Sequence, residues 1–244
     1  ETLIPRAFRG PLTQEDLKIY LNVYDKLREE GEGHYPALRT AMSAVLISPD
    51  FLFRPELGAV EGEEIFALND YQLASRLSYY LWMSMPDQEL FDLAAAGKLN
   101  DPAVLKQQVN RMIASPRAAP MLKSFLGQWL GFSILGETHV PDGRTFRKAW
   151  RDELAAAMKM EPVLFFERLI REGLSLEQLI DGQETFVNED LATHYGIEGV
   201  EGAAFQMVSL QPEQHRGGIL GMASILTTTS TPVRTSPVIR GAWV

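Results

Sequence analysis

Apolar residues recur at helical spacing along most of the chain. Leucines and tyrosines at positions 17, 20, 21, 24 and 27 make one stripe, which Thr13 caps and Gly31 ends. Similar stripes, bounded by caps, prolines or glycines, predict further helices at about 35–46, 70–83, 87–97, 102 onward, 146–171, 188–196 and 217–226. Strand-type alternation is scarce, with FQMVSL (205–210) as a candidate strand. We therefore expect an all-α, compact multi-helix protein with at most a few short strands.

No internal repeat and no clear linker divides the chain. From the helical pattern we expect an N-terminal helical segment (1–66), a central helical domain (67–200) and a C-terminal helix with a connector (201–244). The length of 244 residues is enough to bury a substantial core, and 45% hydrophobic and 23% charged residues are ordinary for a globular protein.

Charge and composition exclude several classes of function. The net charge of −9 and the absence of a basic run argue against a nucleic-acid partner. No apolar run approaches the roughly 20 residues of a membrane span. The absence of cysteine excludes disulfides, thiolate metal sites and covalent c-type haem attachment within these residues. The four histidines lack metal-ligand spacing, so no metal site is predicted.

The most unusual residue is Glu161, which falls on a core-facing stripe of the long helix with Leu154, Met158 and Phe165. A carboxylate there must be paired, hydrogen-bonded or protonated. Pro162 follows it and is expected to kink the helix. Glu161 is therefore interpreted either as part of a buried ion pair that fixes helix packing or as a catalytic, proton-handling acid.

Arg76 is a candidate partner for Glu161, because it lies beside the apolar face of the helix at 70–83. An Arg76–Glu161 ion pair would make an Arg76→Met change strongly destabilising. An arginine at such an edge can also extend to solvent.

His194 is a second catalytic candidate. It lies in the last turn of the helix that Asn188 caps and Gly196 ends, where Glu189 and Asp190 complement the positive end of the helix. Capping by itself explains these polar residues, so a ligand or acid–base role for His194 is the alternative.

The predicted last helix has one side almost bare of side chains. Gly217 and Gly221 are four residues apart, so another helix or the flat face of a cofactor can approach closely. His215 and Met222 flank this side and are candidate axial haem ligands, with surface and core positions as the alternatives. The candidate cofactor-binding residues are thus His215, Gly217, Gly221 and Met222.

Four segments carry a resemblance to a known group of proteins. RAFRGPLT, ASRLSYYLWMSMPDQEL, ETFVNEDLATHYGI and RGGILGMASILTTTSTPVRTSPVIRGAWV resemble, in this order, consecutive domains of unknown function in large secreted proteins typical of planctomycetes, which are associated with c-type cytochrome modules. The resemblance implies that 227–244 connects toward a segment beyond Val244 with a C-x-x-C-H haem attachment sequence. It also implies a periplasmic or secreted location.

From the resemblance we expect a helical scaffold region of a secreted or periplasmic c-type cytochrome protein that serves electron transfer, with the haem outside this chain. Its partner would be the adjacent haem-bearing segment or a redox protein. One alternative is a polysaccharide- or polymer-active enzyme that uses Glu161 or His194. Members of the group often carry a second acid and a Thr near this glutamate, but Met160 and Pro162 stand here, which weakens an acid-pair mechanism. The other alternative is a purely structural interaction module of a larger assembly.

Overall fold

The computed structural model describes residues 3–54, 56, 66–146 and 149–244. It confirms a mostly helical protein with a few short two-stranded sheets. The chain divides into two compact units, Glu1–Ser115 and Pro116–Val244. The three segments expected from the sequence remain a prediction of domain organisation.

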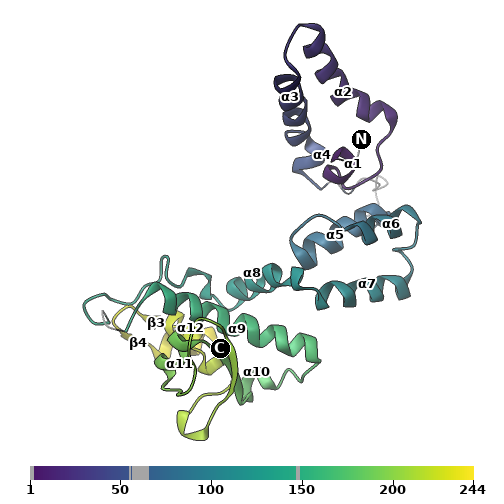
Figure 1. The fold of residues 1–244 in the computed structure, drawn as a ribbon. Coiled ribbons are helices and arrows are strands. Elements are labelled where there is room, and N and C mark those ends of the chain that lie inside the picture. The colour runs from purple at the N-terminus through teal and green to yellow at the C-terminus, as the bar shows by residue number, and fades with distance from the viewer. Residues whose placement is uncertain (1–2, 55, 57–65, 147–148) are drawn as a thin grey trace. The chain divides into compact units, whose positions relative to one another are not determined.

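In the N-terminal unit, the described residues form helices joined by turns and loops, with no strand among them (Figure 1). Its helices are α1 (Leu3–Ala7), α2 (Gln14–Glu29), α3 (His34–Leu46), α4 (Pro49–Leu52), α5 (Asp70–Trp82), α6 (Gln88–Ala95) and α7 (Pro102–Ala114). The predicted cap Thr13 is in place, because its side chain accepts the N–H of Asp16, and the Asn69 side chain caps α5 in the same way by accepting the N–H of Gln72. Helices α2 and α3 lie side by side.

Buried side chains of α5, α6 and α7 form the core of the second half of this unit. Leu90, Leu99 and Met112 are fully buried, and Trp82 Nε1 donates to the Met112 carbonyl at 2.9 Å. The Asp70 carboxylate accepts the N–H of Leu99 at 2.5 Å and so joins the start of α5 to the loop before α7.

The C-terminal unit is built around one long helix. Its elements are η1 (Pro116–Ala118), α8 (Ala119–Trp129), η2 (Phe132–Ile134), α9 (Asp152–Glu172), α10 (Gln178–Asp181), β1 (Glu184–Val187), α11 (Glu189–Tyr195), β2 (Gln206–Ser209), η3 (Pro212–Gln214), η4 (Ile219–Gly221), α12 (Ala223–Thr228), β3 (Ser230–Thr231), β4 (Arg234–Thr235) and α13 (Pro237–Trp243). The predicted strand at 205–210 is confirmed as β2, which pairs antiparallel with β1, with Glu184 opposite Ser209.

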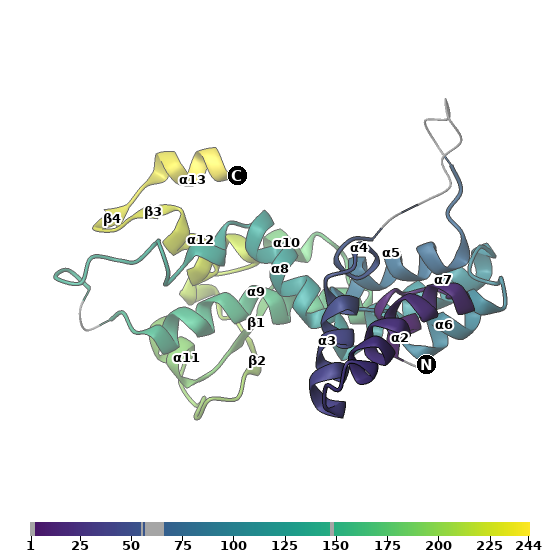
Figure 2. The same cartoon turned by 90° about the horizontal axis from the view of Figure 1, so that it is seen from above.

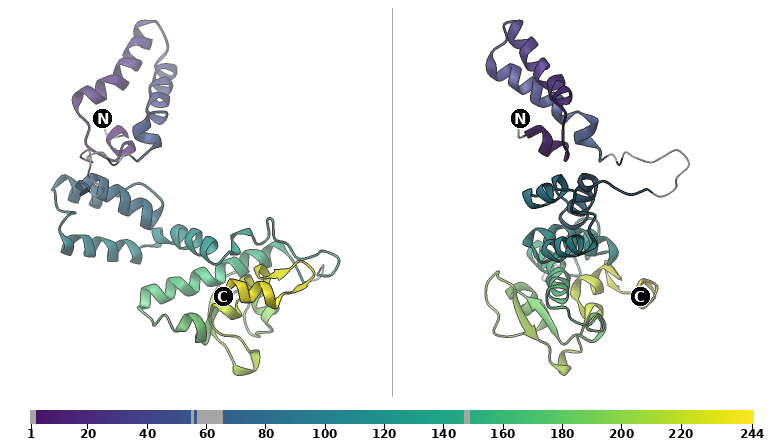
Figure 3. Two further views of the ribbon diagram at one scale, coloured as in Figure 1. Left: turned by 180° about the vertical axis from the view of Figure 1, so that it is seen from behind. Right: turned by 90° about the vertical axis from the view of Figure 1, so that its right-hand side faces the viewer.

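Helix α9 passes between the two sheets of this unit. Figures 2 and 3 show the β1–β2 sheet on one side of α9, and the β3–β4 hairpin with α13 on the other. One apolar cluster joins α9 to α8 and α12 and includes Leu126, Phe165 and Ile225. A second joins it to α11 and includes Met158 and Leu191. The apolar stripe predicted for the long helix therefore faces the core, whereas α2 has no buried residue and Leu21 of its predicted stripe is 51% exposed.

Two predicted helix boundaries are wrong. The long helix begins at Asp152 rather than near Phe146, because the backbone at Arg151 is extended (φ −146°, ψ 156°) and interrupts the preceding turn. The helix predicted at 217–226 is divided into η4 and α12, because Met222 is extended (φ −72°, ψ 138°). Pro162 lies inside α9, which continues across it as one helix.

The segment 227–244, expected to be a connector, is folded in the structure. It completes α12, makes the β3–β4 hairpin and ends in α13. Trp243 packs against the first apolar cluster, and its Nε1 donates to the Leu130 carbonyl at 3.0 Å. None of the helices in the described part of the chain has the length and apolar character to cross a membrane.

Candidate functional site

The Glu161 carboxyl group is buried inside the C-terminal unit and fully hydrogen-bonded. The residue is only 1% exposed. Thr185 Oγ1, on β1, donates to Glu161 Oε1 at 2.7 Å. The Tyr195 hydroxyl, at the end of α11, donates to Glu161 Oε2 at 2.5 Å. Glu161 therefore links α9 to both the sheet and the following helix.

Tyr195 extends this network to the start of α12. Its hydroxyl oxygen accepts the backbone N–H of Ala223 at 2.8 Å, which is one of the N–H groups that a helix start leaves without a partner in its own helix. The Arg216 guanidinium lies 3.8 Å from the centroid of the Tyr195 ring, and its Nη1 donates to the Gly221 carbonyl at 2.7 Å. Four segments of the unit thus meet at one carboxyl group.

The surroundings of Glu161 change its acidity. Burial raises the pKa of Glu161 to about 7, although the hydrogen bonds from Tyr195 and Thr185 and the positive charge of Arg216 act in the opposite direction. Burial, followed by the negative charge of Glu161, raises the pKa of Tyr195 well above its usual value. The carboxyl group is therefore set to exchange a proton near neutral pH.

The predicted Arg76–Glu161 ion pair is wrong. Arg76 pairs instead with the two carboxyl oxygens of Glu56, and both groups are partly exposed. Both oxygens of Glu161 accept from Thr185 and Tyr195. A helical wheel places Arg76 at the edge of an apolar face, but it carries no information about which helix that face meets.

The structure brings several of the sequence candidates together. Glu161, Gly217, Gly221 and Met222 line one small cavity of about 10 Å³, which has room for about one water molecule. His215 does not line this cavity, and its side chain is exposed at the end of η3. The candidate haem ligands His215 and Met222 therefore do not face a common cavity in the described residues.

The glycine-rich turn serves a close backbone approach. Gly218 adopts φ +52°, and a Cβ atom there would lie 2.3 Å from the Leu179 carbonyl oxygen. The Gly218 N–H also donates to the Gly182 carbonyl at 2.9 Å. What approaches this side is thus the chain's own backbone around α10.

A second, larger cavity lies nearer the N-terminal end of α9, where Leu154 and Met158 line it. We name it the apolar groove; its volume is about 380 Å³. Its lining comes from the loop at 141–146, residues 149–150, α9, α11, α12 and the β3–β4 hairpin with α13: Pro141, Phe146, Ala149, Trp150, Leu154, Met158, His194, Leu226, Thr227, Ser230, Thr231, Pro232, Arg234, Thr235 and Arg240. A hydrogen bond from Asp142 N to the Pro232 carbonyl (2.7 Å) joins the loop to the hairpin.

His194 lies at the apolar groove rather than at the buried carboxyl group. Its side chain is exposed, while its neighbour Tyr195 points inward to Glu161. Partial desolvation of the ring, together with the positive charge of Arg216, lowers the pKa of His194. The two catalytic candidates, Glu161 and His194, thus line different cavities.

Sequence reasoning missed Thr185 and Tyr195 as partners of Glu161. The sequence did indicate that both side chains are buried. Thr185 is at an inward position of a short alternating β-type run, and Tyr195 lies four residues after Leu191 on the buried face of a helix. The sequence did not indicate that α11 and β1 both pack against the side of α9 that carries Glu161.

This arrangement is suited to holding structure together rather than to attacking a substrate. Both carboxyl oxygens are occupied, and the adjoining cavity is too small for anything larger than water. No cluster of three or more potential metal ligands occurs among the residues that the structure describes. The apolar groove is the larger of these two cavities, and its lining combines apolar residues with His194 and two arginines.

Comparison with known families gives two matches. PSD4, a protein of unknown function (DUF1592), matches residues 68–197. PSD5, a protein of unknown function (DUF1595), matches residues 1–56. No curated protein and no solved structure matches the chain. Within the chain, the PSD5 (DUF1595) match lies before the PSD4 match. Since the PSD4 match covers more than half of the chain, the chain belongs to the PSD4 family of proteins of unknown function (DUF1592).

Proposed function

We propose that this chain is the helical scaffold region of a secreted or periplasmic c-type cytochrome protein and that it serves electron transfer. In this proposal the C-terminal unit holds a haem-bearing segment, or a redox protein, at the apolar groove, and the haem itself is outside this chain. The observation that carries the proposal is the groove. The resemblance to proteins associated with c-type cytochrome modules supplies the identity of the partner.

The floor and walls of the groove suit a flat apolar group. Leu154 and Met158 form a buried apolar floor, and Phe146 and Trp150 add aromatic surface. A volume of about 380 Å³ is within the range of about 300–1,000 Å³ of ligand sites, at its lower end. The groove can therefore take one edge of a haem, or the side chains around it, without enclosing the whole group.

The rim of the groove carries positive charge in an otherwise acidic chain. Arg234 and Arg240 line the groove, whereas the net charge of the whole chain is −9. Haem has two propionate groups, and arginine is the side chain best suited to pair with carboxylates. The rim thus favours an apolar group with carboxylates at one edge.

The last helix offers a surface for the polypeptide that would carry such a group. Val238 is 81% exposed and Val244 is 81% exposed, beside Ile239 at 44%. Exposed apolar side chains of this kind are available for contact with a partner. Since Trp243 anchors α13 to the core through the Leu130 carbonyl, this surface is held in place.

The enzymatic alternative has less support from the geometry. A catalytic acid must reach its substrate, but Glu161 is 1% exposed. His194 lines the groove without a second acid or base among the other lining residues.

A titration with a short peptide that carries covalently attached haem c tests the proposal. We expect saturable 1:1 binding, measured as a shift of the Soret band. The Ala149→Trp variant fills the groove from its exposed rim and should weaken binding at least tenfold. The Ala149→Ser variant, at the same position, should bind as the wild type does.

Two outcomes would overturn the proposal. One is the absence of saturable binding to the wild-type chain. The other is equal binding by wild type and Ala149→Trp, since the groove would then not be the contact. Circular dichroism of both variants shows whether the fold is intact.

A further inference from the structure

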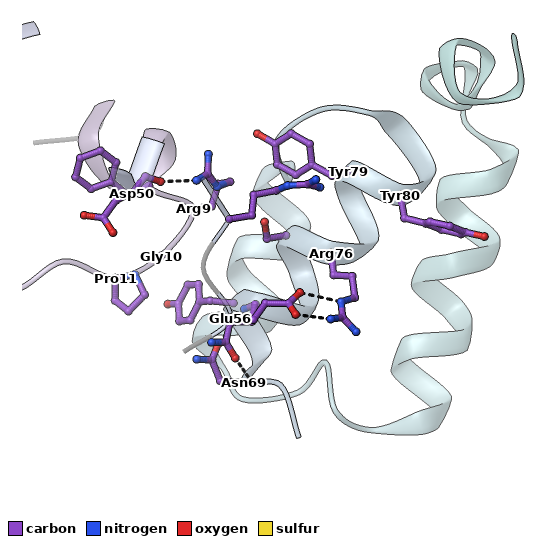
Figure 4. Close-up of a pocket in the computed structure, with 14 residues that line it drawn as sticks. Arg9, Gly10, Pro11, Asp50, Glu56, Asn69, Arg76, Tyr79 and Tyr80 are labelled. Carbon is purple, nitrogen blue, oxygen red and sulfur yellow. Dashed lines mark hydrogen bonds and ion pairs between the residues drawn. The ribbon is translucent and has the colours of Figure 1, made fainter. Parts of the chain in front are cut away.

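A cleft of about 680 Å³ lies within the N-terminal unit, independent of the apolar groove. It is lined by the turn after α1, by three residues in and after α4, and by one face of α5: Phe8, Arg9, Gly10, Pro11, Asp50, Arg54, Glu56, Asn69, Tyr71, Gln72, Ser75, Arg76, Tyr79 and Tyr80 (Figure 4). We name it the tyrosine cleft. Three arginines face two carboxylates there, which leaves one positive charge in excess.

One of these arginines is used to build the wall. The Arg9 guanidinium donates to the backbone carbonyls of Asp50, Phe51 and Phe53, and the residue is only 6% exposed. Asp50 and Phe51 lie in the short helix α4 and Phe53 follows it, so these carbonyls are at a helix end, which leaves acceptors without partners in the helix. Arg9 therefore fixes the chain around α4 and has little capacity left for a ligand.

A second arginine is neutralised within the cleft. Arg76 makes a two-pronged contact with Glu56, from Nε to Oε1 at 2.9 Å and from Nη2 to Oε2 (Figure 4). This pair brings no excess charge to the cleft.

Arg54 is left as the charged group that can receive a ligand. Its guanidinium lies 4.6 Å from the centroid of the Tyr79 ring, and it has no hydrogen bond or ion pair within the part of the chain that the structure describes. Its side chain is exposed. Stacking on an aromatic ring orients the guanidinium while its N–H groups stay available, which is the arrangement that binds a single carboxylate.

The tyrosines give the cleft a second chemical character. Tyr71, Tyr79 and Tyr80 all come from α5, and each has an apolar ring face with a hydroxyl group at its edge. Tyr80 is 75% exposed. Sugar rings have an apolar C–H face and hydroxyl groups around it, so they complement such rings. The carboxylates of Asp50 and Glu56 can accept hydrogen bonds from those hydroxyls.

We propose that the tyrosine cleft binds an acidic saccharide, with the carboxylate of a uronic acid on Arg54 and its sugar ring against the tyrosines of α5. A polyphosphate is a poorer match, because it needs several unpaired cations and the cleft offers one. An aliphatic acid would leave the tyrosine hydroxyls and the carboxylates unused.

Isothermal titration calorimetry of the whole chain tests the inference with three probes: a trimer of glucuronate, the neutral glucose trimer of the same linkage, and free glucuronate. We expect the acidic trimer to bind at least tenfold more tightly than the neutral one. If free glucuronate binds as tightly as the acidic trimer, the ligand is a free sugar acid. If the acidic trimer binds more tightly than free glucuronate, the ligand is a polysaccharide chain. Both results support the proposal.

The matched variants are Arg54→Gln in the cleft and Arg39→Gln on the exposed face of α3, which change the charge equally. Arg54→Gln should remove the preference for the acidic trimer, and Arg39→Gln should retain it. The proposal is overturned if neither acidic probe binds saturably, or if the preference survives in Arg54→Gln. Because both side chains are exposed, neither change should affect folding, which circular dichroism checks.

Discussion

Replacement of Glu161 by glutamine isolates the contribution of one buried carboxyl group to stability. Glutamine keeps the shape of the side chain and can keep hydrogen bonds to Thr185 and Tyr195, but it cannot ionise. In the folded protein, burial raises the pKa of Glu161 from an ordinary 4.5 to about 7. Ionisation is therefore harder in the folded state than in the unfolded chain.

The direction of the pH dependence follows from this difference. Between about pH 4.5 and 7 the folded protein retains a proton on Glu161 that the unfolded chain has released. The contribution of Glu161 to the free energy of unfolding is fully present at low pH, falls as the pH rises through this window and levels off above it. The difference in pKa corresponds to a total loss on the order of 3 kcal/mol.

Urea unfolding of wild type and Glu161→Gln at pH 5 and pH 8, followed by circular dichroism, measures this loss. The free energy of unfolding of Glu161→Gln minus that of wild type should be greater at pH 8 than at pH 5, by on the order of 3 kcal/mol. Titration of the histidines is common to both proteins and cancels in the comparison. The exposed control Glu198→Gln should show no such change.

A parallel pH dependence for wild type and Glu161→Gln would refute this reasoning. It would mean that the carboxyl group ionises as easily in the folded protein as in water, so burial would not govern its acidity. A loss of folding in Glu161→Gln at both pH values would instead show that the network requires the carboxylate form.

Three further changes test the packing around this network and the corrected ion pair. Tyr195→Phe removes the hydroxyl that joins the buried Glu161 carboxyl group to the buried N–H of Ala223. Urea unfolding should show a free energy of unfolding lower by about 2–4 kcal/mol, and a loss below about 0.5 kcal/mol would contradict the network. Gly218→Ala places a Cβ 2.3 Å from a carbonyl oxygen and should lower the melting temperature clearly more than Gly199→Ala, because Gly199 also has a positive φ but open space around it. Equal shifts would count against the close approach. Arg76→Met should lower the free energy of unfolding by less than about 1 kcal/mol, because the ion pair of Arg76 with Glu56 is partly exposed. A large loss of stability in thermal unfolding would instead indicate that Arg76 has a buried partner.

Local features of the fold were predictable because they depend on near neighbours in the chain. The caps Thr13 and Asn188, the stop at Gly196 and the short strand at 205–210 were all recognised correctly. Each depends on a hydrogen bond or a turn that spans a few residues. The core-facing position of Glu161 followed in the same way from the helical period.

Features that depend on distant partners were not predictable. The helical wheel selected Arg76 as the partner of Glu161, but the partners are Thr185 and Tyr195. Likewise, the glycines at 217–221 indicated a close approach without showing that α10 makes it. The helical periodicity of apolar residues defines the buried face of a helix, but it does not indicate which element packs against that face.

By itself, the sequence determined the helical class, most helix ends and the burial of an acid that needs a partner, because these follow from backbone hydrogen bonding and the cost of burying charge. Only the tertiary structure decided which groups surround that acid, that His194 faces a different cavity, and that the segment 227–244 folds back onto the core. These depend on how elements far apart in the chain pack together, and residue spacing along the chain does not encode those contacts directly.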